Sequence, residues 1–239
     1  MKIIPNIPQG VKLIDALKYF RRQKKDIYEC REKNDFEKER EYILNATSDW
    51  GKNVCRSLGI EIEAEGLENL PEKGPVVYVS NHQSYADIGV ACAMLDKFQF
   101  GFIAKNSLEK IPMYGKAIMD IRSIMIERED PRESLKAIKA GVELIENGFS
   151  LYIFPEGTRS RCHEMAEFKK GSLKLATKPG VPVVPITIDG TYKVFEEKGV
   201  ISPARVRFIV HPPIETAGME RKEANNLAET VEAIVRSKL

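Results

Sequence analysis

From Gly59 onward, short apolar segments alternate with helix-forming ones, and this alternation limits the possible folds of the 239-residue chain more than any other feature. The apolar segments have the length and composition of strands. They lie at residues 60–64, 75–80, 98–104, 123–127, 150–154, 183–188 and 206–210. Because strands that alternate with helices form parallel sheets covered on both faces, we expect an α/β fold: a largely parallel sheet flanked by helices.

Two helices of this part carry clear signals. Asp130 is suited to cap a helix and Pro131 to begin it, and Gly148 is suited to follow its last turn. Apolar residues at helical spacing predict the buried faces. In this helix they are Leu135, Ile138, Val142 and Ile145, and in the last helix they are Leu227, Val231 and Ile234.

The first 58 residues have a different character and predict an N-terminal amphipathic two-helix appendage (1–58) in front of the α/β domain (59–239). One apolar stripe contains Val11, Ile14 and Leu17, and another runs from Ile43 to Leu58. Between them, 15 of the 21 residues from 21 to 41 are charged, which predicts a solvent-exposed stretch. Residues 1–25 contain seven basic residues and one acid. Two interpretations are open: both helices pack on the main domain, or the basic first helix lies on an anionic membrane surface.

The densest group of reactive side chains is the segment from Ser80 to Asp87, directly after a predicted strand. If His82 lies in the turn and Asp87 in the first helical turns, the carboxylate can accept a hydrogen bond from one imidazole nitrogen. The other nitrogen is then available as a base. The alternative is a buried histidine that a local carboxylate merely satisfies.

A second group, the segment from Phe154 to Ser160, also follows a strand. Gly157 permits close approach of a ligand to the backbone, and Arg159 offers a planar fork for phosphate or carboxylate. Lys105 and Arg128 each follow another strand, and Arg161, Lys169 and Lys170 add positive charge nearby. The alternative is a polar turn with a surface arginine.

These groups all follow predicted strands, and the carboxyl ends of parallel strands share one edge, where open α/β sheets bind ligands. We therefore expect a base and several cations to meet there, in a site for a substrate that carries a phosphate. The net charge of +2 argues against nucleic acid as a partner. The sequence has no phosphate-binding P-loop, no G-x-S-x-G nucleophile motif and no G-x-G-x-x-G. His163 and His211 lack metal-ligand spacing and are expected at the surface, so no metal is predicted.

Three motifs, in order, resemble those of the glycerolipid acyltransferase family, in particular its bacterial 1-acylglycerol-3-phosphate acyltransferases. They are Asn81-His82-Gln83-Ser84-Tyr85-Ala86-Asp87, Phe154-Pro155-Glu156-Gly157-Thr158-Arg159-Ser160 and Val181-Pro182-Val183-Val184-Pro185-Ile186. A further motif, Met125-Ile126-Glu127-Arg128, ends in the expected acid–arginine pair but has Met where members often carry Phe, and lacks a preceding glycine. The resemblance covers roughly residues 60–190.

The resemblance implies transfer of a fatty acyl group from a thioester to the free hydroxyl of lysophosphatidic acid. His82 and Asp87 are implied to be catalytic, and Lys105, Arg128 and Arg159 to bind the substrate phosphate. Gly157 and Thr158 are implied to bind substrate or the developing oxyanion, and Glu156 to orient a nearby cation. No cofactor is implied beyond the co-substrate, a thioester of coenzyme A or of acyl-carrier protein.

Because acceptor and product are lipids, the resemblance favours an anionic membrane surface as a partner of the first helix. Its basic residues are Lys12, Lys18, Arg21, Arg22, Lys24 and Lys25. No run of 18 apolar residues occurs, so we expect peripheral or monotopic attachment at the cytoplasmic face of the cell membrane. The open alternatives are another acceptor, such as glycerol 3-phosphate, another lysophospholipid or a lipid-A precursor, a thioester hydrolase, and a non-catalytic lipid-binding module.

Overall fold

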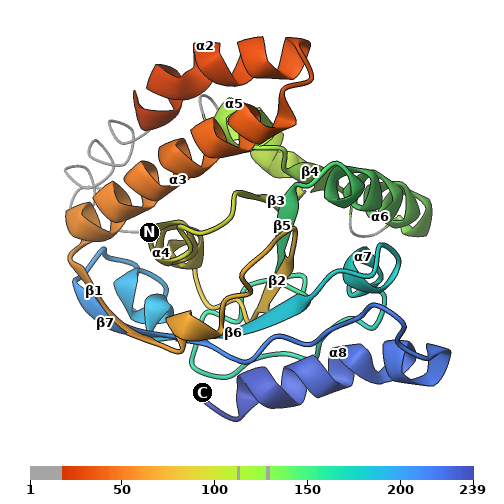
Figure 1. Cartoon of the computed structure of the whole chain (residues 1–239). Helices are drawn as coiled ribbons and strands as arrows, with labels where there is room; N and C mark the ends of the chain where they lie inside the picture. The colour runs from red at the N-terminus through yellow and green to blue at the C-terminus, as the bar shows by residue number, and fades with distance from the viewer. Residues whose placement is uncertain (1–17, 112–113, 128–129) are drawn as a thin grey trace.

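The computed structural model describes residues 18–111, 114–127 and 130–239, and within them seven strands form one sheet (Figure 1). The strands are β1 (Ile60–Glu65), β2 (Val77–Ser80), β3 (Phe100–Lys105), β4 (Ile124–Ile126), β5 (Ser150–Ile153), β6 (Val183–Asp189) and β7 (Ala204–Val210). The helices are α2 (Lys18–Glu32), α3 (Phe36–Leu58), α4 (Ala86–Met94), α5 (Tyr114–Asp120), α6 (Pro131–Glu146), α7 (Lys174–Thr177) and α8 (Arg221–Arg236). Single 3-10 turns are η2 (Leu67–Asn69), η3 (Asn106–Lys110) and η4 (Thr191–Val194).

The strand order is β1-β7-β6-β2-β5-β3-β4, and every neighbouring pair is parallel except β6 and β7. The predicted fold class is therefore confirmed. Five adjacent strands, β6-β2-β5-β3-β4, end at the same edge of the sheet. The antiparallel pairing of β7 with β6 reverses β7 and β1, so their carboxyl ends point to the other edge.

Helices cover both faces of the sheet, with α3 and α4 on one side and α8 on the other (Figure 1). Alternation along the strands divides their side chains between two cores. Tyr78, Phe100 and Tyr152 form an aromatic cluster in the core beneath α3 and α4. Val79 and Leu151 belong to the core beneath α6, α7 and α8. Each face of the central strands is thus fully buried, which explains why they appear in the sequence as continuous apolar runs.

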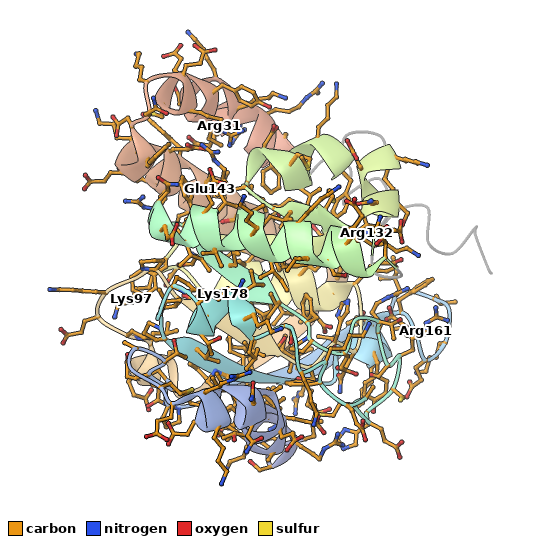
Figure 2. The ribbon with its side chains drawn as sticks, turned by 90° about the vertical axis from the view of Figure 1, so that its right-hand side faces the viewer. Arg31, Lys97, Arg132, Glu143, Arg161 and Lys178 are labelled. Carbon is orange, nitrogen blue, oxygen red and sulfur yellow. The ribbon has the colours of Figure 1, made fainter. Side chains whose placement is uncertain are left out.

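Helix α6 begins as predicted, and of its four predicted buried residues Ile145 is buried, Ile138 and Val142 are half-buried, and Leu135 is exposed. The Asp130 carboxylate accepts a hydrogen bond from the backbone N–H of Arg132 at 2.8 Å. Leu135, predicted to be buried, is 61% exposed, whereas Ala137 and Ile145 are buried. The helix approaches its neighbours so closely that a Cβ on Gly141 would lie 2.3 Å from Leu175 Cδ2. Small residues therefore define the contact face, and the outward face carries charged residues such as Arg132 and Glu143 (Figure 2).

The predicted two-helix appendage corresponds to α2 and α3, but α2 lies mostly in the stretch that was predicted to be charged and solvent-exposed, and Val11, Ile14 and Leu17 lie outside the described residues. The prediction of a solvent-exposed charged stretch is wrong at Glu39, which is fully buried. Its carboxylate lies 2.7 Å from guanidinium nitrogens of Arg31 and Arg122, so two cations compensate for the burial of its charge (Arg31 is labelled in Figure 2).

Helix α3 packs tightly on α4: a Cβ on Gly51 would lie 2.5 Å from the backbone nitrogen of Ala93.

The division into units 1–58 and 59–239 stays a prediction. Among the residues that the structure describes, no helix is both long and apolar enough to cross a membrane.

Candidate active site

The loops after β2 and β5 lie side by side at the shared edge of the five parallel strands, because these two strands are neighbours. The backbone N–H of Ser160 donates to the carbonyl oxygen of His82 at 2.8 Å, and that of Arg161 donates to the carbonyl oxygen of Gln83 at 3.2 Å. These bonds join two motifs that are more than seventy residues apart in the sequence. The edge therefore brings together the two loops that the sequence singled out.

The predicted contact between His82 and Asp87 is confirmed. Asp87 lies in the first turn of α4, and its Oδ2 lies 2.7 Å from His82 Nδ1. The same oxygen accepts hydrogen bonds from the backbone N–H groups of Gln83 and Ser84, at 2.8 and 2.9 Å. The other oxygen, Oδ1, accepts from the hydroxyl of Thr191. Because the aspartate oxygens only accept, Nδ1 of His82 carries the proton and Nε2 is left as the acceptor.

The imidazole ring of His82 is held on its face as well as at Nδ1. It stacks on the ring of Phe154 with a centroid distance of 4.0 Å and an interplanar angle of 21°. The side chain is 11% exposed, and no hydrogen-bond partner of Nε2 is found among the described residues. A ring fixed in this way presents one basic nitrogen in a constant direction, as general-base catalysis requires.

Glu156 connects the two loops through its carboxylate. Its Oε1 accepts from the backbone N–H of His82 at 2.5 Å, and its Oε2 accepts from that of Ala166 at 2.8 Å. The residue is buried, and this desolvation raises the pKa of the carboxyl above its ordinary value against the lowering effect of the two backbone bonds. The expectation that Glu156 orients a cation is therefore wrong, since both oxygens bind backbone amides.

Gly157 follows with a φ of +76°, a conformation that favours glycine. A Cβ at this position would lie 2.8 Å from Lys169 Nζ, so the glycine makes room for an amine. The backbone N–H of Gly157 was expected to lie near the developing oxyanion. In the structure this N–H donates to the carbonyl oxygen of Phe154 at 3.0 Å, so the donor is already used. Thr158 is exposed.

The predicted cations differ in their surroundings. Arg159 donates from Nη1 to the buried carboxylate of Glu196 at 2.8 Å, and its guanidinium carbon lies 3.5 Å from the ring centroid of Tyr85. Lys105 ends β3 at the same edge of the sheet, and its side chain is exposed. Arg128 lies outside the described residues. The structure thus places two of the three predicted phosphate ligands at the edge.

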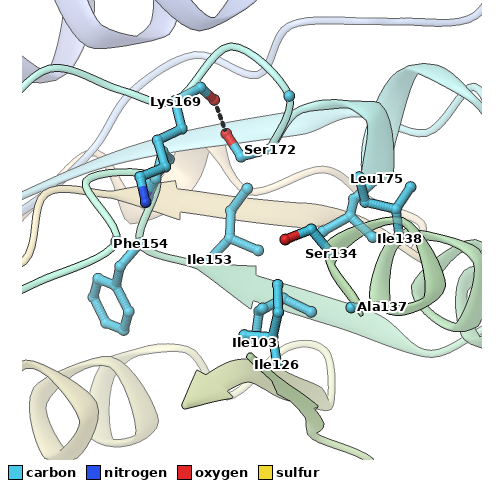
Figure 3. Close-up of a pocket in the computed structure, with 13 residues that line it drawn as sticks. Ile103, Ile126, Ser134, Ala137, Ile138, Ile153, Phe154, Lys169, Ser172 and Leu175 are labelled. Atoms are coloured by element: carbon cyan, nitrogen blue, oxygen red, sulfur yellow. Dashed lines mark hydrogen bonds between the residues drawn. The ribbon is translucent and has the colours of Figure 1, made fainter. Parts of the chain in front are cut away.

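A cavity of about 210 Å³ lies beside this edge (Figure 3). Phe154 lines it, so one aromatic ring contacts both the cavity and the imidazole of His82. Most of the lining is aliphatic, contributed by Ile103, Ile126, Ile138, Ile153 and Leu175. Polar groups at its wall are few: the amine of Lys169 and the hydroxyls of Ser134 and Ser172 (Figure 3). A cavity of this composition suits an alkyl chain.

Several contacts of the site come from a segment that sequence analysis missed, residues 190–196 after β6. Thr191 donates to Asp87, and Glu196 accepts from Arg159. Gly190 donates from its backbone to Gln83 Oε1 at 2.9 Å, which fixes the position of the segment against the first motif. The signal was available: these residues follow the carboxyl end of a parallel strand, as His82, Lys105 and Glu156 do.

No cluster of three or more His, Cys, Asp or Glu side chains suited to a metal ion occurs among the residues described. Of the other histidines, His163 is exposed and pairs with Asp189 at 2.9 Å, as expected for the surface. His211 is 7% exposed, which contradicts the expectation of a surface residue. Its Nε2 lies 2.8 Å from the hydroxyl oxygen of Thr187 in β6, so strand pairing holds it inside.

Comparison with known proteins places this geometry in context. A family model described as Acyltransferase matches residues 61–189. The chain is 42% identical over 157 residues to the chloroplast 1-acyl-sn-glycerol-3-phosphate acyltransferase LPAT1 of Arabidopsis thaliana, covering 64% of this chain and 44% of that protein. It is 31% identical over 187 residues to a 1-acyl-sn-glycerol-3-phosphate acyltransferase of Borreliella burgdorferi, covering 76% and 72%. The match spans about half the length of the plant and algal relatives.

A solved structure shares the fold over nearly the whole chain. The crystal structure of PlsC, a 1-acyl-sn-glycerophosphate (LPA) acyltransferase from Thermotoga maritima, superposes with a TM-score of 0.73 and 29% sequence identity. The similarity covers 96% of this chain and 95% of that one. It therefore includes the N-terminal helices as well as the sheet.

Proposed function

The chain belongs to the Acyltransferase family, and from this premise we propose that it transfers a fatty acyl group from an acyl thioester to the free hydroxyl of lysophosphatidic acid, giving phosphatidic acid. The observation that carries the proposal is the pair of His82 and Asp87, 2.7 Å apart and buried at the edge where parallel strands end. The relatives named above are 1-acyl-sn-glycerol-3-phosphate acyltransferases.

In the proposed reaction, His82 Nε2 takes the proton of the acceptor hydroxyl while the hydroxyl oxygen attacks the thioester carbonyl carbon. Asp87 stabilises the imidazolium that forms. The tetrahedral intermediate then collapses: its carbonyl re-forms, the carbon–sulfur bond breaks, and the proton passes from His82 to the leaving thiolate. The products are an ester and a free thiol, and no covalent acyl-enzyme is needed.

Two cations support binding of the acceptor phosphate in this proposal. Arg159 provides a planar set of N–H donors that matches phosphate oxygens, and Lys105 adds a mobile positive charge at the end of β3. The aliphatic cavity behind Phe154 offers space for a fatty acyl chain within reach of the same edge. Arg128 is included as a third phosphate ligand on the strength of its motif alone.

We also propose an anionic membrane surface as a partner, contacted by the basic first helix. On α2, the side chains of Arg21 and Lys25 are exposed, whereas Lys24 lies 3.3 Å from the carboxylate of Asp120. The double variant Arg21→Glu/Lys25→Glu is expected to sediment less than the parent protein with vesicles that contain phosphatidylglycerol. With purely zwitterionic vesicles, the variant and the parent are expected to sediment to the same small extent. Unchanged sedimentation with the anionic vesicles would contradict this contact.

An acyl-transfer assay tests the function directly. Purified protein is given an acyl-coenzyme A or an acyl-carrier-protein thioester together with lysophosphatidic acid, glycerol 3-phosphate or another lysophospholipid. Phosphatidic acid formed at the highest kcat/KM supports the proposal and identifies the donor. Thioester cleavage without an acceptor would indicate a hydrolase, and binding without turnover a non-catalytic module.

A further inference from the structure

Glu196 is a buried carboxylate at the centre of the edge, and the proposed reaction leaves it without a role. Its side chain is 4% exposed. Oε2 accepts from the Ser84 hydroxyl at 2.7 Å, and Oε1 accepts from the backbone N–H of Tyr85 at 3.3 Å and from Arg159 Nη1 at 2.8 Å. Burying a carboxylate is costly unless such donors compensate. One side chain from the segment after η4 thus holds the loops that follow β2 and β5.

These contacts fix the plane of the Arg159 guanidinium. Glu196 accepts a hydrogen bond from Nη1, and the ring of Tyr85 covers one face of the guanidinium group, with its centroid 3.5 Å from the guanidinium carbon. The Arg159 side chain is still 17% exposed, so part of it faces solvent. A guanidinium carries five N–H donors in a fixed plane, and the contacts above use few of them. The remaining donors are therefore presented to a ligand in a set orientation.

We infer that Glu196 is a positioning residue for acceptor binding: it holds Arg159 so that the guanidinium meets the phosphate of the substrate. The inference rests on the proposed function, in which Arg159 binds that phosphate. Binding is tighter when a donor is held in its bound geometry, because less conformational freedom is lost.

An effect of charge alone would change the KM for lysophosphatidic acid in the opposite direction, so the two explanations can be distinguished. Glu196 cancels the positive charge of Arg159, so removing the carboxylate makes the edge more attractive to phosphate. If charge decided binding, Glu196→Ala would lower the KM for lysophosphatidic acid. If positioning decides it, the same variant raises that KM, although the local charge has become more favourable.

The experiment compares steady-state kinetics of Glu196→Ala, Glu196→Gln and Glu196→Asp. Glu196→Ala and Glu196→Asp are expected to raise the KM for lysophosphatidic acid about 10-fold, because the first removes the contact with Arg159 and the second withdraws it by one methylene. Glu196→Gln keeps an acceptor for Arg159 and is expected to stay within about 3-fold of the parent. The KM for the acyl donor is expected to stay unchanged in all three variants.

Glu197→Ala serves as the matched control, since Glu197 is the neighbouring acid, its side chain is 45% exposed, and its carboxylate lies 3.9 Å from Lys198 Nζ. Turnover of a monoacylglycerol, which lacks the phosphate, should be the same in Glu196→Ala and the parent. Combined with Arg159→Lys, Glu196→Ala should add little to the effect of Arg159→Lys alone, because both changes act on one contact.

An unchanged or lowered KM for lysophosphatidic acid in both Glu196→Ala and Glu196→Asp, or an equal loss with monoacylglycerol, would overturn the inference. Should Glu196→Ala fail to fold, the comparison of Glu196→Asp with Glu196→Gln decides the matter, because both side chains keep an oxygen acceptor and differ in its reach toward Arg159. The proposed function fails separately, if the parent protein does not acylate lysophosphatidic acid. The assignment of Arg159 fails separately too, if Arg159→Lys leaves the acceptor KM unchanged.

Discussion

His82 and His211 are both buried, and each comes within two residues of the end of a strand, but the two strands run in opposite directions. His82 follows β2, which is parallel to both of its neighbours. His211 follows β7, which is antiparallel to β6. The reversal of β7 places His211 beside Pro185 of β6, whose partner in β2 is Val79, whereas His82 lies beyond the carboxyl end of β2.

The hydrogen-bond partners of the two imidazole rings also differ. His82 Nδ1 lies 2.7 Å from the carboxylate of Asp87, an acceptor that holds the proton on Nδ1. His211 Nε2 lies against the hydroxyl of Thr187, which itself donates to the carbonyl oxygen of Val235. Burial, and to a smaller extent the charge of Lys238, lower the pKa of His211 below its ordinary value. Burial by itself therefore does not mark a reactive histidine, and the proposed role of His82 rests on a fully buried carboxylate partner, which His211 lacks.

Replacement of each histidine gives the sharpest test of this comparison. His82→Ala is expected to lower kcat at least ~100-fold, the usual contribution of a positioned general base. His211→Gln keeps an N–H donor for Thr187 and is expected to leave kcat within about 2-fold of the parent, as is usual for a change away from the reacting groups. Circular dichroism is used to check that both variants are folded. Near-normal turnover in folded His82→Ala, or a large loss in His211→Gln, would break the distinction.

Replacement of the carboxylate should have an effect of nearly the same size. Asp87→Asn offers His82 an amide in place of an oxygen that only accepts, which allows the wrong imidazole tautomer. We expect kcat to fall at least ~100-fold while the KM for the acyl donor changes little. A variant with Asp87→Asn that keeps most of its turnover would show that Asp87 only fixes the loop before α4, through the backbone N–H groups of Gln83 and Ser84.

The sequence predicted the parts of this comparison that depend on local chemistry. Strands came out within two residues of their bounds, because the central ones are continuous apolar runs and β1 alternates apolar residues with exposed glutamates. The contact of His82 with Asp87 followed from a turn and a single helical turn. Neither prediction needed knowledge of distant partners.

The missed features all depend on distant partners. The direction of β7 is set by its pairing with β6, and no pattern within residues 204–210 reveals it, so His211 was placed at the surface. Glu39 is buried because Arg31 and Arg122 approach it, and Arg122 is 83 residues away. Leu135 is exposed because α6 approaches its neighbours along Ala137, Gly141 and Ile145, and Leu135 lies outside that face. The contacts of Thr191 and Glu196 likewise join residues far apart in the chain.

A smaller effect is expected from replacing a lysine near each of the two histidines. Lys105 ends β3 at the edge of His82, and Lys238 contributes to the surroundings of His211. Lys105→Ala is expected to raise the KM for lysophosphatidic acid about 10-fold and to leave that for the acyl donor unchanged, because one charge-assisted contact to phosphate is lost. Lys238→Ala is the matched control and should change neither. If only the donor KM rises in Lys105→Ala, this cation serves the other substrate.

The smallest expected effect concerns the stability contributed by His211. Because the pKa of His211 is lowered in the folded protein, the unfolded chain binds a proton more readily, and stability rises with pH wherever that difference operates. The contribution is fully present above the ordinary value of about 6.5 and is lost as the pH falls below it, at most about 1.4 kcal/mol per pH unit. His211→Gln cannot titrate and should therefore lose less stability on acidification than the parent. Urea unfolding of both proteins between pH 8 and pH 5 measures this, and carboxyl groups that titrate in the same range cancel in the difference. Parallel stability profiles would mean that His211 is as free to bind a proton in the fold as in the unfolded chain, and its contrast with His82 would then rest on position alone.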